Sequence, residues 1–112
     1  MIINLSPCVS NAQLELERRG ETLIINGEVF DFSVMKDGDS LPSSAIKSSF
    51  FLIDVKKYNG ELEFTMLLPI PEIYSHEQAF PKPLTDIRDG VVILPQGLTE
   101  TDNALDVGRS TL

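Results

Sequence analysis

Two Asn-Gly dipeptides, Asn26-Gly27 and Asn59-Gly60, constrain this chain more than any other feature of its sequence. They lie within residues 13–33 and 50–70, where apolar and polar residues alternate. A two-residue hairpin loop of type I′ needs a positive φ at both central residues, and Asn followed by Gly tolerates this best. The sequence therefore predicts two antiparallel hairpins, and the repeated Asn-Gly-Glu is explained as turn chemistry rather than as a duplicated unit.

The first loop sets the expected pairing of its strands. Ile25 then faces Glu28, Ile24 faces Val29 and Leu23 faces Phe30. One face of this hairpin collects four large apolar side chains and is the expected core face. These are Leu23, Ile25, Phe30 and Phe32.

The second loop predicts a longer hairpin with one nearly apolar face. On this face the expected pairs are Lys57 with Leu62, Val55 with Phe64, Ile53 with Met66, and Phe51 with Leu68. The opposite face is polar, and there Lys56 falls opposite Glu63 as a candidate cross-strand ion pair. This register places apolar residues together on one face and polar residues together on the other, which favours it.

The remaining segments read as connections and one short strand. Residues 36–49 predict a loop with one helical turn between Pro42 and Lys47, with Ser40 as its cap. The four prolines of residues 69–87 predict an extended crossing segment. Residues 90–95 predict a last short buried strand. The apolar side chains expected to hold the crossing segment on the sheet are Ile70, Ile73, Tyr74 and Phe80.

These elements together predict a mainly β fold with little helix. A small antiparallel sheet curled into a barrel or a sandwich is the expected architecture. A chain of 112 residues corresponds to one domain. We expect this β domain to span residues 1–95, and residues 96–112 to form an acidic, flexible C-terminal tail.

The charge excludes some classes of partner. Seventeen acidic residues against nine basic ones give a net charge of −8, which repels phosphate backbones and anionic lipid surfaces. No segment approaches the roughly 20 apolar residues that a membrane helix needs. We therefore expect no nucleic-acid or membrane partner. The single cysteine gives no internal disulfide, so a cytoplasmic location is expected.

The residue types that carry catalysis or bind metals are few and scattered. Cys8 and His76 are the only cysteine and histidine, whereas zinc sites need several such ligands. A Cys8–His76 nucleophilic pair stays open, because sequence does not give distance. Acidic residues 37–40 lack the rest of a calcium loop, and Glu61 and Glu63 lie at an exposed hairpin tip. We predict no enzyme activity and no catalytic, cofactor-binding or metal-binding residues.

Several segments together resemble a known group of proteins. They are MIINLSP, GETLIINGEVFDFS, LPSSAI, YNGELEFTMLLPIP, FPKPL and DGVVILP, all within residues 1–95. In these the chain resembles small prophage-encoded proteins whose genes lie near phage tail genes. The resemblance transfers no catalytic residue, and residues 96–112 have no counterpart in it. It implies a tail-associated or virion-assembly role and a virion-associated location as the alternative to the cytoplasm.

Two hypotheses of function follow. The first is a phage-derived protein that acts by protein–protein association, with itself as a homo-oligomer or with a phage structural protein. The second is a small-ligand-binding β module with a pocket under residues 69–87. An enzyme, the third class, would need Cys8 or His76 beside a carboxylate in a cleft.

Overall fold

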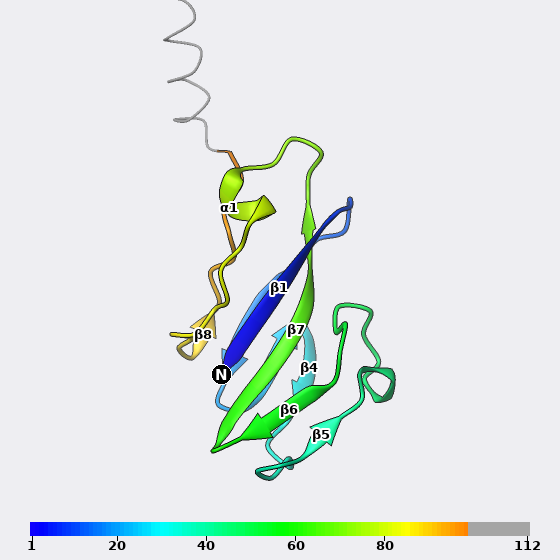
Figure 1. The fold of residues 1–112 in the computed structure, drawn as a ribbon, viewed down its shortest axis with the longest axis vertical. Coiled ribbons are helices and arrows are strands. Elements are labelled where there is room, and N and C mark those ends of the chain that lie inside the picture. Colours follow the sequence, from blue (N-terminus) through cyan, green and yellow to red (C-terminus); the bar gives the residue numbers. More distant parts are fainter. Residues whose placement is uncertain (99–112) are drawn as a thin grey trace, which may run out of the picture.

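The computed structural model describes residues 1–98 and shows two four-stranded sheets packed against each other (Figure 1). The sheet orders are β1-β7-β6-β5 and β4-β3-β2-β8. The elements are β1 Ile2–Val9, β2 Leu16–Arg19, β3 Thr22–Ile25, β4 Glu28–Asp31, β5 Ser40–Leu41, a 3-10 turn Ser43–Ala45, β6 Val55–Tyr58, β7 Glu61–Ile70, α1 His76–Ala79 and β8 Gly90–Val91. The prediction of a mainly β fold is confirmed, and the architecture is a sandwich rather than a closed barrel.

Both hairpin loops form at the expected dipeptides. Asn26 and Asn59 each have a φ of 51°, and the glycines that follow them are also in the positive-φ region. In the first hairpin, all three expected pairs between β3 and β4 are present. The Asn-Gly dipeptides therefore determine the two loops from local sequence, as expected for two-residue hairpin loops.

The second hairpin keeps the expected register only near its loop. Lys57 pairs with Leu62 and Lys56 with Glu63, but Phe51 bridges to Met66 and not to Leu68. Three residues lie between Phe51 and Val55, whereas only one lies between Phe64 and Met66 on β7, so the segment 52–54 bulges out. The exposure of residues 52–54 is the consequence, and the expected facing of Ile53 and Met66 is wrong.

One strand pair was not foreseen. β1 lies parallel to β7 along its whole length, from Ile2 opposite Glu63 to Val9 opposite Ile70. The first sheet is therefore mixed rather than purely antiparallel. Parallel neighbours need a long crossover connection, and here β2, β3 and β4 of the second sheet lie in the chain between them, followed by β5 and β6.

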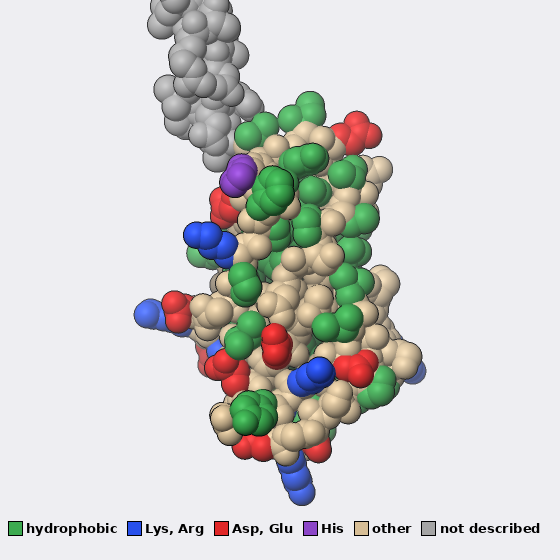
Figure 2. Space-filling view, viewed as in Figure 1, with side chains coloured by type: hydrophobic (Ala, Val, Ile, Leu, Met, Phe, Trp, Pro, Cys, Tyr) green, Lys and Arg blue, Asp and Glu red, His purple; other side chains and the backbone are tan. Residues whose placement is uncertain are grey.

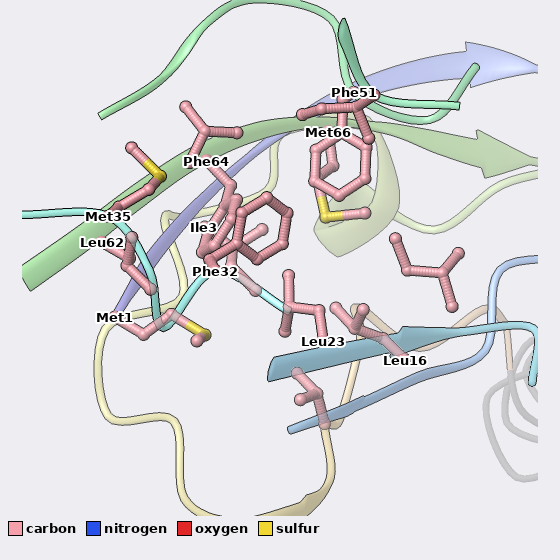
Figure 3. Packing of buried hydrophobic residues seen from close by; sticks show 14 residues of the cluster. Met1, Ile3, Leu16, Leu23, Phe32, Met35, Phe51, Leu62, Phe64 and Met66 are labelled. Atoms are coloured by element: carbon pink, nitrogen blue, oxygen red, sulfur yellow. The ribbon is translucent and has the colours of Figure 1, made fainter. Parts of the chain in front are cut away.

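The core lies between the two sheets (Figure 3). Phe64 of β7 is fully buried, and its ring centroid lies 4.9 Å from that of Phe32 in an edge-to-face arrangement. Phe51 contacts the rings of both Phe30 and Phe32 in the same geometry. Such pairs add about 0.5–1.5 kcal/mol beyond their area burial. This cluster joins both hairpins into one core, as the face assignment from Leu23 to Phe32 predicted.

Two expectations about the connections were partly wrong. The helical turn in residues 36–49 exists, but Pro42 is its N-cap residue and no side chain caps it. Residues 71–87 contain the short helix α1 rather than only extended chain. Proline excludes helix interiors, but residues 72–80 contain none, and this leaves room for one turn.

The expected side-chain anchors of this segment are mostly exposed. Ile70 is buried, but Ile73 and Phe80 are 78% and 70% exposed, and Tyr74 is 46% exposed. The last strand also differs from its prediction, because Val92 is buried while Val91 and Ile93 are not. Of the expected tail, residues 99–112 lie outside the described residues.

Candidate functional site

The residues weighed for catalysis are not brought together around a metal or a nucleophile. Cys8 is exposed near the end of β1, where its Sγ lies 3.8 Å from the Val9 carbonyl oxygen. His76 opens α1, and its ring lies 5.0 Å from that of Phe80. Within residues 1–98, no group of three His, Cys, Asp or Glu side chains is placed to hold a metal ion.

The acidic residues singled out in the sequence support turns and strands instead. The Asp37 carboxylate accepts a hydrogen bond from the Gly60 backbone N–H at 2.7 Å, which braces the second hairpin loop. Asp39 accepts one from the Lys36 N–H at 2.7 Å. The Glu63 carboxylate accepts from the Asn4 side-chain amide at 2.9 Å, and the ion pair expected with Lys56 is absent from the described chain.

Exposed apolar side chains gather at one end of the sandwich, around α1. We call this the apolar end; it consists of Val9, Ile73, Tyr74 and Phe80. Figure 2 shows apolar side chains over the upper half of the molecule and most of the charged ones over the lower half. Large exposed apolar patches on a soluble domain mark interaction surfaces. The sequence signal for this end was present, but it was read as packing onto the sheet.

The helix α1 is held rigidly at the base of the apolar end. Ser75 and Gln78 form a reciprocal capping box, in which the Gln78 N–H donates to the Ser75 Oγ at 3.1 Å and the Ser75 N–H donates to the Gln78 Oε1 at 3.0 Å. The Ser75 hydroxyl also donates to the Gln96 carbonyl at 2.6 Å. These bonds fix the position of Phe80 and join the chain after β8 to the helix.

A groove of about 870 Å³ opens beside this connection. One wall is residues 12–17, and the other is residues 91–96. Apolar side chains of β7, β2 and these walls line it, with Gln78 as a polar group at one side. A second groove of about 500 Å³ lies between residues 83–89 and 91–93. Of the segment 69–87, under which a pocket is predicted, Pro69 and Gln78 line the larger groove and residues 83–87 line the smaller one.

The strand β8 is an edge of its sheet, and its outer side is open. The Val92 N–H donates to the Leu16 carbonyl at 2.8 Å, so the backbone groups of Val92 face β2. The groups of Val91 and Ile93 therefore face away from the sheet, because successive residues of a strand alternate. Val91 is 80% exposed and Ile93 is 76% exposed.

Residues 87–90 before β8 are fastened to β2 by polar contacts. The Arg18 guanidinium donates to the Gly20 carbonyl at 2.8 Å and also to the Ile87 carbonyl. Asp89 accepts from the Gly20 N–H at 2.9 Å and lies 3.8 Å from the Arg18 Nε. These contacts hold the entry to β8 in place, so its outer edge is a defined surface.

The other edge of this sheet is β4, and it carries acidic residues. Glu28 and Asp31 are both exposed at its two ends. Hydrogen bonds from the Ser33 hydroxyl and backbone N–H lower the pKa of Asp31, and one from the Thr22 hydroxyl does so to a smaller extent. Asp31 therefore keeps its negative charge to a lower pH than an ordinary aspartate does.

Comparison of the chain with protein-family models, with curated proteins and with solved structures finds no match to any of them. Function must therefore be argued from the surfaces described above. Among residues 1–98, no helix is long and apolar enough to cross a membrane. The open side of β8 is the surface that sequence reasoning missed. The sequence predicts a buried strand at residues 90–95, and a run of apolar residues gives no signal that Val91 and Ile93 stay exposed.

Proposed function

We propose that this protein is a non-enzymatic, phage-derived module that acts by protein–protein association, in a tail-associated or virion-assembly role. Its partners are a second copy of itself and a phage structural protein. The phage origin rests on the sequence resemblance of residues 1–95. The association rests on the surfaces of the fold.

One observation carries the proposal: large apolar side chains stay uncovered on a fold with a complete core. Ile73 and Phe80 at the apolar end are 78% and 70% exposed, while Phe64, Leu23 and Ile3 are fully buried. The sandwich therefore does not need the exposed side chains for its own packing. Apolar area left in water by a folded domain is available to drive association, at about 25 cal/mol per Å² buried.

The net charge sets the conditions under which self-association should be seen. Two copies that each carry a charge of −8 repel each other. Salt at about 0.15 M screens charges beyond about 8 Å, whereas it does not weaken apolar contacts. Association should therefore increase with ionic strength, which is the opposite of what a complex held by ion pairs would show.

The experiment is molar mass in solution, from size-exclusion chromatography with light scattering, over a concentration series at low and moderate salt. The expected result is a discrete dimer or larger ring that becomes more populated with concentration and with salt. A mass of 12.4 kDa under every condition would contradict self-association. The substitution Phe80→Asp tests the apolar end, and Val34→Asp, at a residue 80% exposed in the loop after β4, is its control.

A second candidate function, small-ligand binding, is favoured by the groove of about 870 Å³ beside α1. Its volume lies in the range of small-molecule sites, and its lining is mainly apolar with a few polar groups. Native mass spectrometry of the purified protein tests this candidate directly. An additional mass that disappears on denaturation would support it, and the bare chain mass in every preparation would contradict it.

A further inference from the structure

The proposed function leaves open which surface a second copy contacts, and the fold offers an answer. We propose that two copies pair through the outer edge of β8, antiparallel to each other and related by a two-fold axis at Val92. This inference rests on the proposed self-association. It would join two four-stranded sheets into one continuous sheet across the dimer.

The backbone of this edge supplies hydrogen-bond donors and acceptors that point away from the sheet. Val92 donates to Leu16 within the sheet, so the N–H and C=O groups of Val91 and Ile93 point outward. An outward row of unpaired donors and acceptors is a template for another strand. Among residues 1–98, no backbone group bonds the outward N–H and C=O of Val91 and Ile93, and the two residues are 80% and 76% exposed.

The three other sheet edges are each protected against such pairing. On β1, the outward N–H and C=O of Ile3 are hydrogen-bonded to the backbone of Leu84. Further along the same edge, Pro7 also faces outward, and it has no N–H to offer. β5 is as short as β8, but Pro42 at one of its outward positions has no N–H, and β4 carries Glu28 and Asp31. Proline and charge are known means of preventing edge pairing. The β8 edge has neither between Gly90 and Leu94.

Charge and register favour a second copy as the occupant. Residues 90–95 form a run of six uncharged residues in a chain that is otherwise strongly acidic. With the two-fold axis at Val92, each Val91 faces Ile93 of the second copy, and both pairs can exchange backbone hydrogen bonds. Asp89 then faces Pro95 of the second copy, and Arg88 faces Gln96. No like charges are opposed, and β-branched side chains meet across the new strand pair.

The test compares two valine-to-lysine substitutions on opposite edges of the same sheet. Val91→Lys places a charge on the proposed interface, and Val29→Lys places the same charge on β4, where Val29 is 64% exposed. Both sites are exposed, so neither change removes core packing. Light scattering should show that Val91→Lys raises the dimer dissociation constant at least about tenfold, since each lysine would replace an apolar cross-strand contact with Ile93 and would lie diagonally across from the other lysine, while Val29→Lys leaves it within about twofold.

A second variant and a second measurement test the same interface without introducing a charge. Ile93→Pro removes a backbone N–H that has no partner within residues 1–98, so the dimer should weaken while the monomer keeps its core. Amide hydrogen exchange at Val91 and Ile93 should slow at least tenfold at concentrations that populate the dimer. The amide of Val29, which also faces outward from a sheet edge, should not change.

The outcomes separate this inference from the proposed function. A dimer that persists in Val91→Lys, with fast exchange at Val91 and Ile93, would overturn the β8 interface and leave self-association standing. A wild-type chain that is monomeric at every concentration would overturn both.

Discussion

The two Asn-Gly hairpins begin from the same turn and end in different surroundings. Both asparagines have a φ of 51°, yet their side chains differ in what they do. The Asn26 Oδ1 accepts from the Glu15 N–H at 2.7 Å, and its Nδ2 donates to the Gln13 carbonyl at 2.8 Å. Within residues 1–98 the Asn59 side chain makes no hydrogen bond, and Asp37 braces that loop instead, through the Gly60 N–H.

The comparison shows that one local signal can serve two tertiary roles. The loop at Asn26 also organises the chain that enters β2, because it holds residues 13–15 in place. The loop at Asn59 connects the short strand β6 to the ten-residue strand β7, which forms the middle of the other sheet. The first turn therefore depends on the side chain of its asparagine, and the second depends on its backbone conformation and on the hydrogen bond from the Gly60 N–H to Asp37.

The largest effect should come from removing the core contact shared by both hairpins. Phe64→Ala should lower the free energy of unfolding by about 3–5 kcal/mol, because the side chain is fully buried and stacks on Phe32. Leu23→Ala, the fully buried counterpart in the first hairpin, should cost about 2–5 kcal/mol. Urea denaturation followed by circular dichroism measures both. Loss of one sheet with retention of the other would contradict a single shared core.

The next largest change in the free energy of unfolding should distinguish Asn26 from Asn59. Glycine keeps the positive φ but removes the side chain, so Asn26→Gly isolates two hydrogen bonds worth about 0.5–1.5 kcal/mol each. We expect a loss of about 1–3 kcal/mol for Asn26→Gly and a change near zero for Asn59→Gly. Chemical denaturation of the two variants gives the difference. Equal losses would show that the Asn26 side chain has no special role.

A smaller loss of stability, equal in the two turns, is expected when their glycines are replaced by alanine. Gly27 has a φ of 84° and Gly60 of 76°, and a Cβ at either position would meet no atom within 4 Å. Replacement by alanine therefore costs only backbone strain, about 1–2 kcal/mol at each site. Thermal unfolding of Gly27→Ala and Gly60→Ala should give matching shifts. A clearly larger shift at one site would reveal a contact in the turn beyond the strain of its backbone.

The smallest effect concerns pH and only the first hairpin. The lowered pKa of Asp31 means that its contribution to stability is present above the unfolded-state pKa. That contribution is lost as the pH falls through the still lower folded-state pKa. Asp31→Asn should therefore cause a small loss of stability at neutral pH, where the contribution is present, and flatten the acid limb of the stability curve. An Asp31 resonance that titrates at the ordinary pKa in NMR would contradict this.

Sequence and structure agree best where contacts are local. The adjacent Asn and Gly residues determine the two hairpin loops at Asn26 and Asn59. The alternation of apolar and polar residues places Leu23 and Phe64 in the core. Agreement fails where a segment's environment comes from distant chain. The bulge at residues 52–54 depends on the pairing of Phe51 with Met66, and no turn signal records that pairing. The candidate surfaces at α1 and β8 were mispredicted for the same reason.

Taken alone, the sequence determined the fold class, both hairpin loops and the first hairpin's register, because turn geometry and period-two alternation are properties of neighbouring residues. Only the tertiary structure decided that β1 lies parallel to β7, and that Ile73, Phe80, Val91 and Ile93 remain in water. The physical reason is that an apolar residue carries no record of which surface, if any, will cover it. Burial depends on the space left by distant segments, and at α1 and β8 the described chain leaves that space open.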